Sequence, residues 1–259
     1  MRKLSLVFLS LCVVGYMAWM GAVIMLAPLM MYKPVSEPFV HSGNVSDVDG
    51  IPVVVVPGTS DKVVLYLQGT TGKRSGLIAP MESYNEKGFH VVSFAYPGAE
   101  GRPGKMSEEQ LVTDALSVFD ALSDVTGVEN PKVVVHGYSL GGGLALRLGL
   151  VRDFEALVFQ SGVFSMCEIV GQHAFVPACI MNLDQWDMRG HMTYMNEPTL
   201  IVHGALDEAV PLEQAEWLEG ELKGAGVDVE RVVYPETGHT GFQHTSYLEE
   251  IDAFLSKRF

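Results

Sequence analysis

The chain has 259 residues, of which 48% are hydrophobic and 19% are charged, enough for one domain with a sizeable core and too apolar for a disordered protein. It carries 17 basic and 31 acidic residues, a formal net charge of −14, which argues against a nucleic-acid partner because phosphate backbones need a basic face. Three cysteines are too few for a disulfide-rich scaffold.

The N-terminal part of the chain contains a long uncharged segment, from Leu4 to Tyr32. About 20 apolar helical residues cross a bilayer core, so this segment is long enough to span a membrane with some tilt. We therefore predict that residues 1–33 form an N-terminal membrane anchor. A cleaved signal peptide is the alternative, although the segment is longer than a typical signal core and lacks, after Cys12, small residues spaced for cleavage.

The charges at the N-terminus predict the orientation of this anchor. Arg2 and Lys3 precede the apolar segment, and basic residues next to a span tend to stay in the cytoplasm. The protein is therefore expected to cross the membrane once, with its main domain on the extracytoplasmic side. If the segment were cleaved as a signal peptide, the protein would instead be secreted.

Residues 34–259 alternate short β-branched runs with amphipathic stretches, separated by glycines and prolines. The runs predicted as strands are Val53–Val56, Lys62–Leu67, Val91–Ala95, Lys132–Val135, Ala156–Phe159, Thr199–Val202 and Val229–Tyr234. The stretches predicted as helices are Ser107–Asp124, Leu140–Val151, Leu212–Leu222 and Tyr247–Phe259. This alternation predicts a single α/β domain with a mostly parallel sheet flanked by helices.

Residues 161–196 interrupt this alternation with a stretch that has no clear period and is rich in methionine and aromatic side chains. We predict a short lid insertion in which Met166, Trp186 and Met188 line an apolar substrate pocket. The alternative is a pair of helices that pack on the core. Cys167 and Cys179 lie in the same stretch, either as a disulfide that clamps the lid or as two buried thiols.

A G-x-S-x-G sequence spans residues 137–141, directly after a predicted strand and at the start of a predicted helix. A serine on such a tight turn needs neighbours without side chains, and the glycines at 137 and 141–143 satisfy that need. Ser139 is therefore the predicted nucleophile, and the backbone N–H of Leu140 points to where negative charge would develop. A glycine-rich packing turn without catalytic function is the alternative.

A serine nucleophile needs a base, and the base needs an acid that orients it. Asp207 follows the predicted strand Thr199–Val202 and is the candidate acid, with Glu208 as the nearest competitor. His239 follows the last predicted strand and is the candidate base, with His244 as its rival. The sequence has no H-E-x-x-H, C-x-x-C or comparable metal-ligand spacing, so we expect no metal ion.

The order Ser139, Asp207, His239, together with the elbow sequence, resembles the α/β-hydrolase superfamily. The chain is most similar to membrane-tethered serine hydrolases of the ABHD-type and prolyl-oligopeptidase-like groups. Gln68-Gly69-Thr70, after the predicted strand Lys62–Leu67, resembles the oxyanion loop of that superfamily, although Gln68 stands where the family usually has histidine. The resemblance implies that the backbone N–H groups of Thr70 and Leu140 form the oxyanion hole.

We therefore predict a serine hydrolase that cleaves carboxylic ester or thioester bonds through an acyl-enzyme, without a cofactor. The expected partners are a small-molecule or lipid-like acyl substrate and, through the N-terminal helix, the membrane. Two other functions stay open. One is a serine peptidase of the aminopeptidase type, and the other is a hydrolase-like binding module that has lost its chemistry.

Overall fold

The computed structural model describes residues 2–35, 43–71, 78–181 and 186–259. The strands are β1 Asn44–Val48, β2 Ile51–Val56, β3 Lys62–Leu67, β4 His90–Phe94, β5 Lys132–Tyr138, β6 Ala156–Gln160, β7 Thr199–Gly204 and β8 Val229–Tyr234. The α-helices are α1 Arg2–Met31, α2 Ile78–Glu86, α3 Glu108–Asp120, α4 Leu122–Thr126, α5 Leu140–Gly149, α6 Met166–Ala174, α7 Glu213–Gly224 and α8 Tyr247–Leu255. Short 3₁₀ turns η2, η3 and η4 lie at Ala178–Ile180, Met192–Tyr194 and Phe242–His244.

In the described part of the chain the strands form one sheet in the order β1-β2-β4-β3-β5-β6-β7-β8. The pairs from β4 to β8 are parallel, whereas β1 and β2 are antiparallel additions at one edge. The predicted α/β-hydrolase fold with a mostly parallel sheet is therefore confirmed. Parallel strands present their C-terminal ends at one edge of the sheet, which is where loops that carry function meet.

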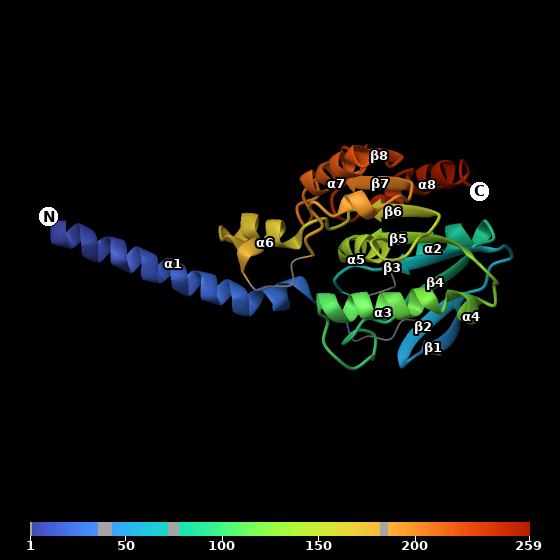
Figure 1. Ribbon diagram of the computed structural model, residues 1–259, viewed down its shortest axis with the longest axis horizontal. Coiled ribbons are helices and arrows are strands. Elements are labelled where there is room, and N and C mark those ends of the chain that lie inside the picture. The colour runs from blue at the N-terminus through green and yellow to red at the C-terminus, as the bar shows by residue number, and fades with distance from the viewer. Residues whose placement is uncertain (1, 36–42, 72–77, 182–185) are drawn as a thin grey trace.

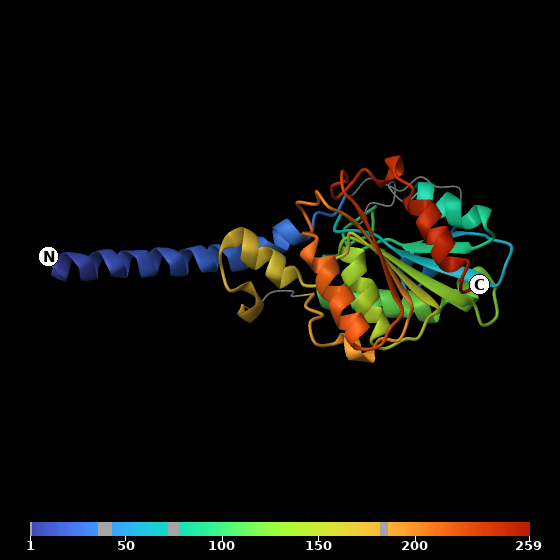
Figure 2. The same cartoon turned by 90° about the horizontal axis from the view of Figure 1, so that it is seen from above.

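Alternate side chains of the central strands contribute to two separate cores. On β3, Val63 and Leu65 pack with α3, α5 and α7, whereas Val64 and Tyr66 pack with α2 and α8. The sheet is thus covered by helices on both faces (Figures 1 and 2). This explains why the strands are almost continuously apolar, because both faces of a covered parallel sheet exclude water.

The predicted strands and helices are all present in the structure, although most of their bounds differ by a few residues. The bounds of Lys62–Leu67 and Val229–Tyr234 are as predicted, and Ser107 caps α3 by accepting a hydrogen bond from a backbone N–H. The predicted helix 107–124 is divided at Ala121 into α3 and α4. The sequence did not predict β1 or α2, and β2 and β3, which are consecutive in sequence, are separated in the sheet by β4.

The N-terminal helix α1 projects away from the rest of the molecule, and α6 lies beside its C-terminal half in both views (Figures 1 and 2). By length and composition the segment Leu6–Leu29 could cross a membrane, and most of its side chains are exposed. A helix that is apolar all round and exposed is typical of a bilayer environment rather than of a water-soluble core. Among the α1 side chains whose burial the structure describes, those buried against the protein are Val23, Ala27 and Met31.

Candidate active site

Ser139 lies on the sharp turn between β5 and α5, with a φ of 56° and a ψ of −120°. Such a left-handed backbone is strained for a residue with a side chain, and it persists because the surroundings fix it. A Cβ atom at Gly137 would lie 2.3 Å from the carbonyl oxygen of Gly141, and one at Gly141 would lie 2.0 Å from that of Leu67. Glycine is therefore required at both positions, and the turn holds the Ser139 side chain above the end of the sheet.

The structure brings the three predicted catalytic side chains together from loops that follow β5, β7 and β8. The Ser139 Oγ atom lies 3.0 Å from His239 Nε2, and His239 Nδ1 lies 2.8 Å from Asp207 Oδ2. The two histidine contacts use opposite ring nitrogens, the arrangement in which one nitrogen can accept the serine proton while the other donates to the carboxylate. Neither Glu208 nor His244 takes part in these contacts.

The Asp207 carboxylate is buried and is held on both of its oxygen atoms. Its Oδ1 accepts hydrogen bonds from the backbone N–H groups of Ala209 and Val210, at 3.0 and 2.8 Å. Burial alone would raise the pKa of Asp207, but the hydrogen bond from His239 and the neighbouring donors outweigh it and lower the pKa below its usual value. The side chain is therefore ionised at neutral pH, as an acid that orients a histidine must be.

Two further residues hold this arrangement in place, and neither was predicted from the sequence. The hydroxyl of Tyr138 donates a hydrogen bond to the backbone carbonyl of His239 at 2.9 Å, and burial raises its pKa to about 12, so it stays protonated. A Cβ atom at Gly204 would lie 2.3 Å from the carbonyl oxygen of Thr237, so only glycine lets the β7 and β8 loops approach. Tyr138 occupies a variable position of the elbow sequence, which gives no local signal for such a contact.

The predicted oxyanion loop runs past Ser139 in direct contact with it. A Cβ atom at Gly69 would lie 3.2 Å from the Cβ of Ser139. The side chain of the preceding residue, Gln68, is fully buried and donates to the carbonyl of Phe94 at 2.7 Å. The backbone carbonyl of Gln68 accepts a hydrogen bond from the Tyr96 hydroxyl at 2.9 Å. Gln68 thus holds the loop in place through these hydrogen bonds, at the position where the superfamily usually has histidine.

Thr70 and Leu140 lie in the wall of the same cavity as Ser139 and His239. The Thr70 hydroxyl donates a hydrogen bond to the carbonyl of Met31 at the end of α1, and the Thr70 carbonyl accepts one from the N–H of Lys33 at 3.3 Å. The N-terminal helix therefore fixes the loop that carries Thr70. The position fits the predicted oxyanion hole, and its role in catalysis remains a prediction.

The cavity above Ser139 has a volume of about 510 Å³ and mostly apolar walls. One wall is α1, which contributes Trp19, Ala22, Val23, Leu26, Ala27 and Met31. The opposite wall comes from the insertion, which contributes Val163, Met166, Ile169, Val170, His173 and Ala174. Pockets of about 300–1,000 Å³ with this kind of lining are typical of small-molecule sites.

The insertion differs from the prediction in the placement of two residues. Met166 lines the cavity, but Trp186 and Met188 are fully buried in the main core and do not line it. Trp186 packs against Gly143 of α5, and its indole N–H donates to the hydroxyl of Tyr32 at 2.9 Å. These two side chains fix the base of the insertion, and their packing gives no support to a contact with substrate. Residues 182–185 of the predicted lid lie outside the described residues.

Cys167 and Cys179 form a disulfide, which joins the first turn of α6 to η2. Among the described residues, these two cysteines and Asp187 are the one group of side chains close enough together to hold a metal ion. Because both sulfur atoms are already bonded to each other, the group lacks the thiolates that a metal site would need.

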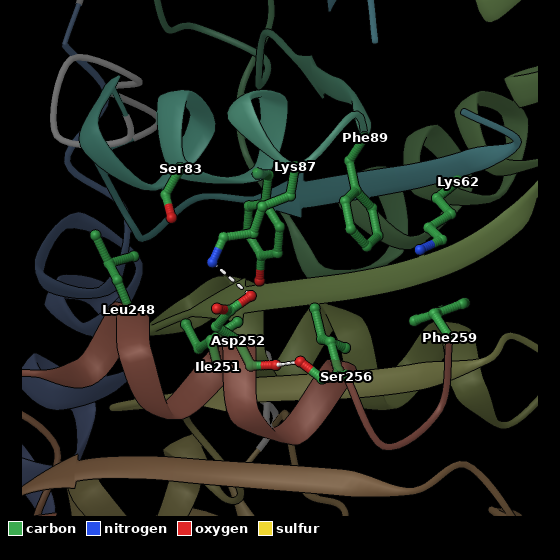
Figure 3. A pocket seen from close by; sticks show the side chains of 11 residues that line it. Lys62, Ser83, Lys87, Phe89, Leu248, Ile251, Asp252, Ser256 and Phe259 are labelled. Atoms are coloured by element: carbon green, nitrogen blue, oxygen red, sulfur yellow. Dashed lines mark hydrogen bonds and ion pairs between the residues drawn. The ribbon is translucent and has the colours of Figure 1, made fainter. Parts of the chain in front are cut away.

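A second cavity, of about 280 Å³, lies between α2 and α8 (Figure 3). Lys87 and Asp252 form an ion pair across it, and Lys62 lies over the rings of Phe89 and Phe259. Ser139 and His239 do not line this cavity, and neither a histidine nor a cysteine is among the described residues that line it. The Ser139–His239–Asp207 set therefore belongs to the cavity next to α1.

Comparison with known proteins agrees with this geometry. The model of the prolyl oligopeptidase family, Peptidase_S9, matches residues 83–259, which include all three members of the Ser139–His239–Asp207 set. The chain belongs to the prolyl oligopeptidase family. The predicted resemblance to α/β-hydrolases of the ABHD-type and prolyl-oligopeptidase-like groups is therefore confirmed.

Among similar proteins, an uncharacterized protein of Mycobacterium tuberculosis is 30% identical over 70% of this chain and 64% of its own length. Lysophosphatidylserine lipase ABHD12 of Gallus gallus is 36% identical over 46% of this chain and 32% of its own. The chain thus spans less than two thirds of these curated relatives. The Pyrococcus furiosus esterase Pf2001 superposes with a TM-score of 0.72 at 17% identity, covering 88% of this chain and 99% of that one, which shows a shared fold.

Proposed function

We propose that this protein is a membrane-anchored serine hydrolase that cleaves carboxylic ester or thioester bonds of substrates with apolar acyl groups. The observation that carries the proposal is the hydrogen-bonded line from Ser139 through His239 to Asp207 at the base of the apolar cavity. The name of the relative ABHD12, a lysophosphatidylserine lipase, supports a lipid ester as the substrate.

The reaction that this geometry supports has two steps. In the first, His239 accepts the proton of Ser139 as Oγ attacks the substrate carbonyl, and then passes it to the leaving group. Asp207 stabilises the transient imidazolium without being protonated. In the second, His239 activates a water molecule that hydrolyses the acyl-enzyme and restores Ser139. The N–H groups of Thr70 and Leu140 would hold the oxyanion in both steps, each contributing about 3 kcal/mol.

The lining of the cavity favours an acyl substrate over a peptide N-terminus. An aminopeptidase has to bind a positively charged amine, and a carboxylate is the side chain that pairs with it. Among the described residues that line the cavity, the ionisable ones are Lys33, His173 and His239, and none of them is acidic. A cationic substrate end would find no partner there, whereas a hydrocarbon chain would contact α1 and the insertion.

Covalent labelling tests the proposed chemistry on the full chain in detergent. A fluorophosphonate probe should label the protein and should fail to label Ser139→Ala. Ser256→Ala is the matched control, because Ser256 is exposed, lines the cavity between α2 and α8 rather than the one that contains Ser139, and should leave labelling unchanged. Nitrophenyl esters of increasing acyl length and aminoacyl amides then separate the functions. Faster cleavage of the amides than of the esters would favour the peptidase. Labelling of Ser139→Ala to the same extent as the unaltered chain would refute the proposal.

We also propose that α1 is retained as a single membrane anchor with the catalytic domain on the extracytoplasmic side. Removal of α1 as a signal peptide would remove one wall of the cavity and the Met31 carbonyl that Thr70 contacts. The Cys167–Cys179 disulfide supports an oxidising compartment for the domain. Intact mass of the protein purified from membranes tests retention, and protease accessibility in sealed vesicles tests the orientation.

A further inference from the structure

The tip of the insertion, residues 174–181, is apolar, exposed and attached to α1. Phe175 and Ile180 are 84% and 85% exposed, the highest values among the large hydrophobic side chains of the described residues. Side chains of this size that project into water are costly, and two of them on one short tip are not explained by packing. The catalytic reaction proposed above does not use either side chain, because neither lines the cavity.

Specific contacts hold this tip against the part of α1 that could cross a membrane. The Tyr16 hydroxyl donates to the carbonyl of Phe175 at 3.2 Å, and the Trp19 indole N–H donates to the carbonyl of Ala174 at 2.8 Å. Val23 packs in a small core with side chains of the tip and its base: Cys167, Val176, Ala178 and Met181. The disulfide closes the loop between α6 and η2, so the tip is one compact unit docked on α1.

The position of these contacts along α1 sets the depth of the tip. A bilayer core takes about 20 helical residues at about 1.5 Å each. A span that starts at Leu6 therefore ends near Met25, and Trp19 and Tyr16 lie about 9 and 14 Å inside that end. If α1 crosses the membrane, the tip attached to these residues cannot remain in water.

We propose that the tip of the insertion, with Phe175 and Ile180, is embedded in the bilayer leaflet that surrounds the C-terminal half of α1, and that substrate enters the catalytic cavity sideways from that leaflet. The acyl part of the proposal rests on the serine hydrolase function proposed above. A lipid in the leaflet would slide between α1 and α6, the two walls that converge on Ser139. Its acyl chain would then never cross water on the way to the nucleophile.

The charged side chains of the insertion that the structure describes pair with one another. Arg189 forms ion pairs with both Glu168 and Asp187, beside the disulfide. On α6, His173 Nδ1 donates to the carbonyl of Ile169 at 2.8 Å, so the ring already has one hydrogen-bond partner. Paired charges next to the exposed apolar side chains of Phe175 and Ile180 are compatible with an element that lies in the membrane interface.

Depth can be measured without any activity assay on the full chain in phosphatidylcholine vesicles. Phe175→Trp adds an indole at the tip, and Val45→Trp adds one on the edge strand β1, where the native valine is 68% exposed. In Figure 1, β1 lies away from α6 and from the projecting part of α1. Lipids brominated on their acyl chains should quench the added emission of Phe175→Trp but not that of Val45→Trp. If aqueous iodide quenches both variants equally and brominated lipid quenches neither, the tip lies in water and the proposal is refuted.

Substrate entry is tested by charging the tip. The double variant Phe175→Asp/Ile180→Asp should lower hydrolysis of a long-chain ester embedded in vesicles by about tenfold, because a carboxylate resists insertion. Its hydrolysis of a water-soluble butyrate ester should stay unchanged, as should both activities of the control Val45→Asp. If the double variant keeps the activity of the unaltered chain on the embedded ester, or loses activity on both esters to the same extent, entry from the leaflet is refuted. If the chain without substitutions is not labelled by the fluorophosphonate probe and hydrolyses neither ester, the proposed serine hydrolase function is refuted instead.

Discussion

His136 makes the stability of the catalytic platform depend on pH in a way that can be calculated. It lies on β5, three residues before the nucleophile, and is fully buried. Its Nδ1 is 3.0 Å from the hydroxyl of Tyr84, and its Nε2 is 3.0 Å from Oε1 of Gln160. Burial lowers the pKa of His136 to about 3, although the hydrogen bond to Gln160 acts in the opposite direction. The native protein therefore keeps this ring neutral in mild acid.

The unfolded chain binds a proton at this histidine below pH 6.5, whereas the native state binds none until about pH 3. Because the unfolded state carries more protons in this window, the free energy of unfolding falls as pH falls. Integration over the two pKa values gives a loss of about 2 kcal/mol between pH 7 and pH 5. The result barely changes if the native pKa is one unit higher, since the native ring is still neutral at pH 5.

The variant His136→Asn removes the titration and keeps an acceptor for Tyr84 near the position of Nδ1, whereas Gln160 loses its donor at both pH values. Urea unfolding of both proteins in the same detergent at pH 7 and pH 5 gives the measurement. The variant should be less stable at pH 7 because its side chain is smaller, but its loss between the two pH values should be smaller by about 2 kcal/mol. His203, whose pKa is also lowered by burial, contributes to both proteins and cancels. Equal pH dependence of the two proteins would contradict the reasoning.

Two further predictions concern the active site. In Asp207→Asn, the two backbone donors that hold Oδ1 should fix the amide so that its NH₂ faces His239, which stabilises the wrong tautomer of the imidazole. The kcat should then fall about 10⁴-fold, with little change in the urea midpoint of unfolding. A fall in kcat below tenfold would exclude the proposed role of Asp207. Gly141→Ala should cost about 3 kcal/mol or more because its Cβ meets backbone, whereas Gly220→Ala, in open space on α7, should stabilise by about 0.5–1 kcal/mol. Urea midpoints of the two variants that shift in the same direction would contradict this pair.

The sequence alone determined the features that depend on local pattern. Strands such as β3 and β8 could be located because β-branched runs bounded by turn residues have few other conformations available. The elbow around Ser139 could be located because its glycines leave a recognisable spacing. The sequence could not indicate β1, whose polar residues lie at a sheet edge, or α2, which is short and contains Pro80. In both, packing against the sheet outweighs a weak local preference.

Tertiary structure alone decided what depends on contacts between distant segments. The 0% exposure of Trp186 and Met188 places them in the core, although their composition resembles that of a pocket lining. Met166 and α1 line the same cavity although more than 130 residues separate them in the sequence. A local sequence pattern does not encode contact between such distant segments. The bond between Cys167 and Cys179 was decided in the same way, since spacing sets whether two cysteines can meet and the fold sets whether they do.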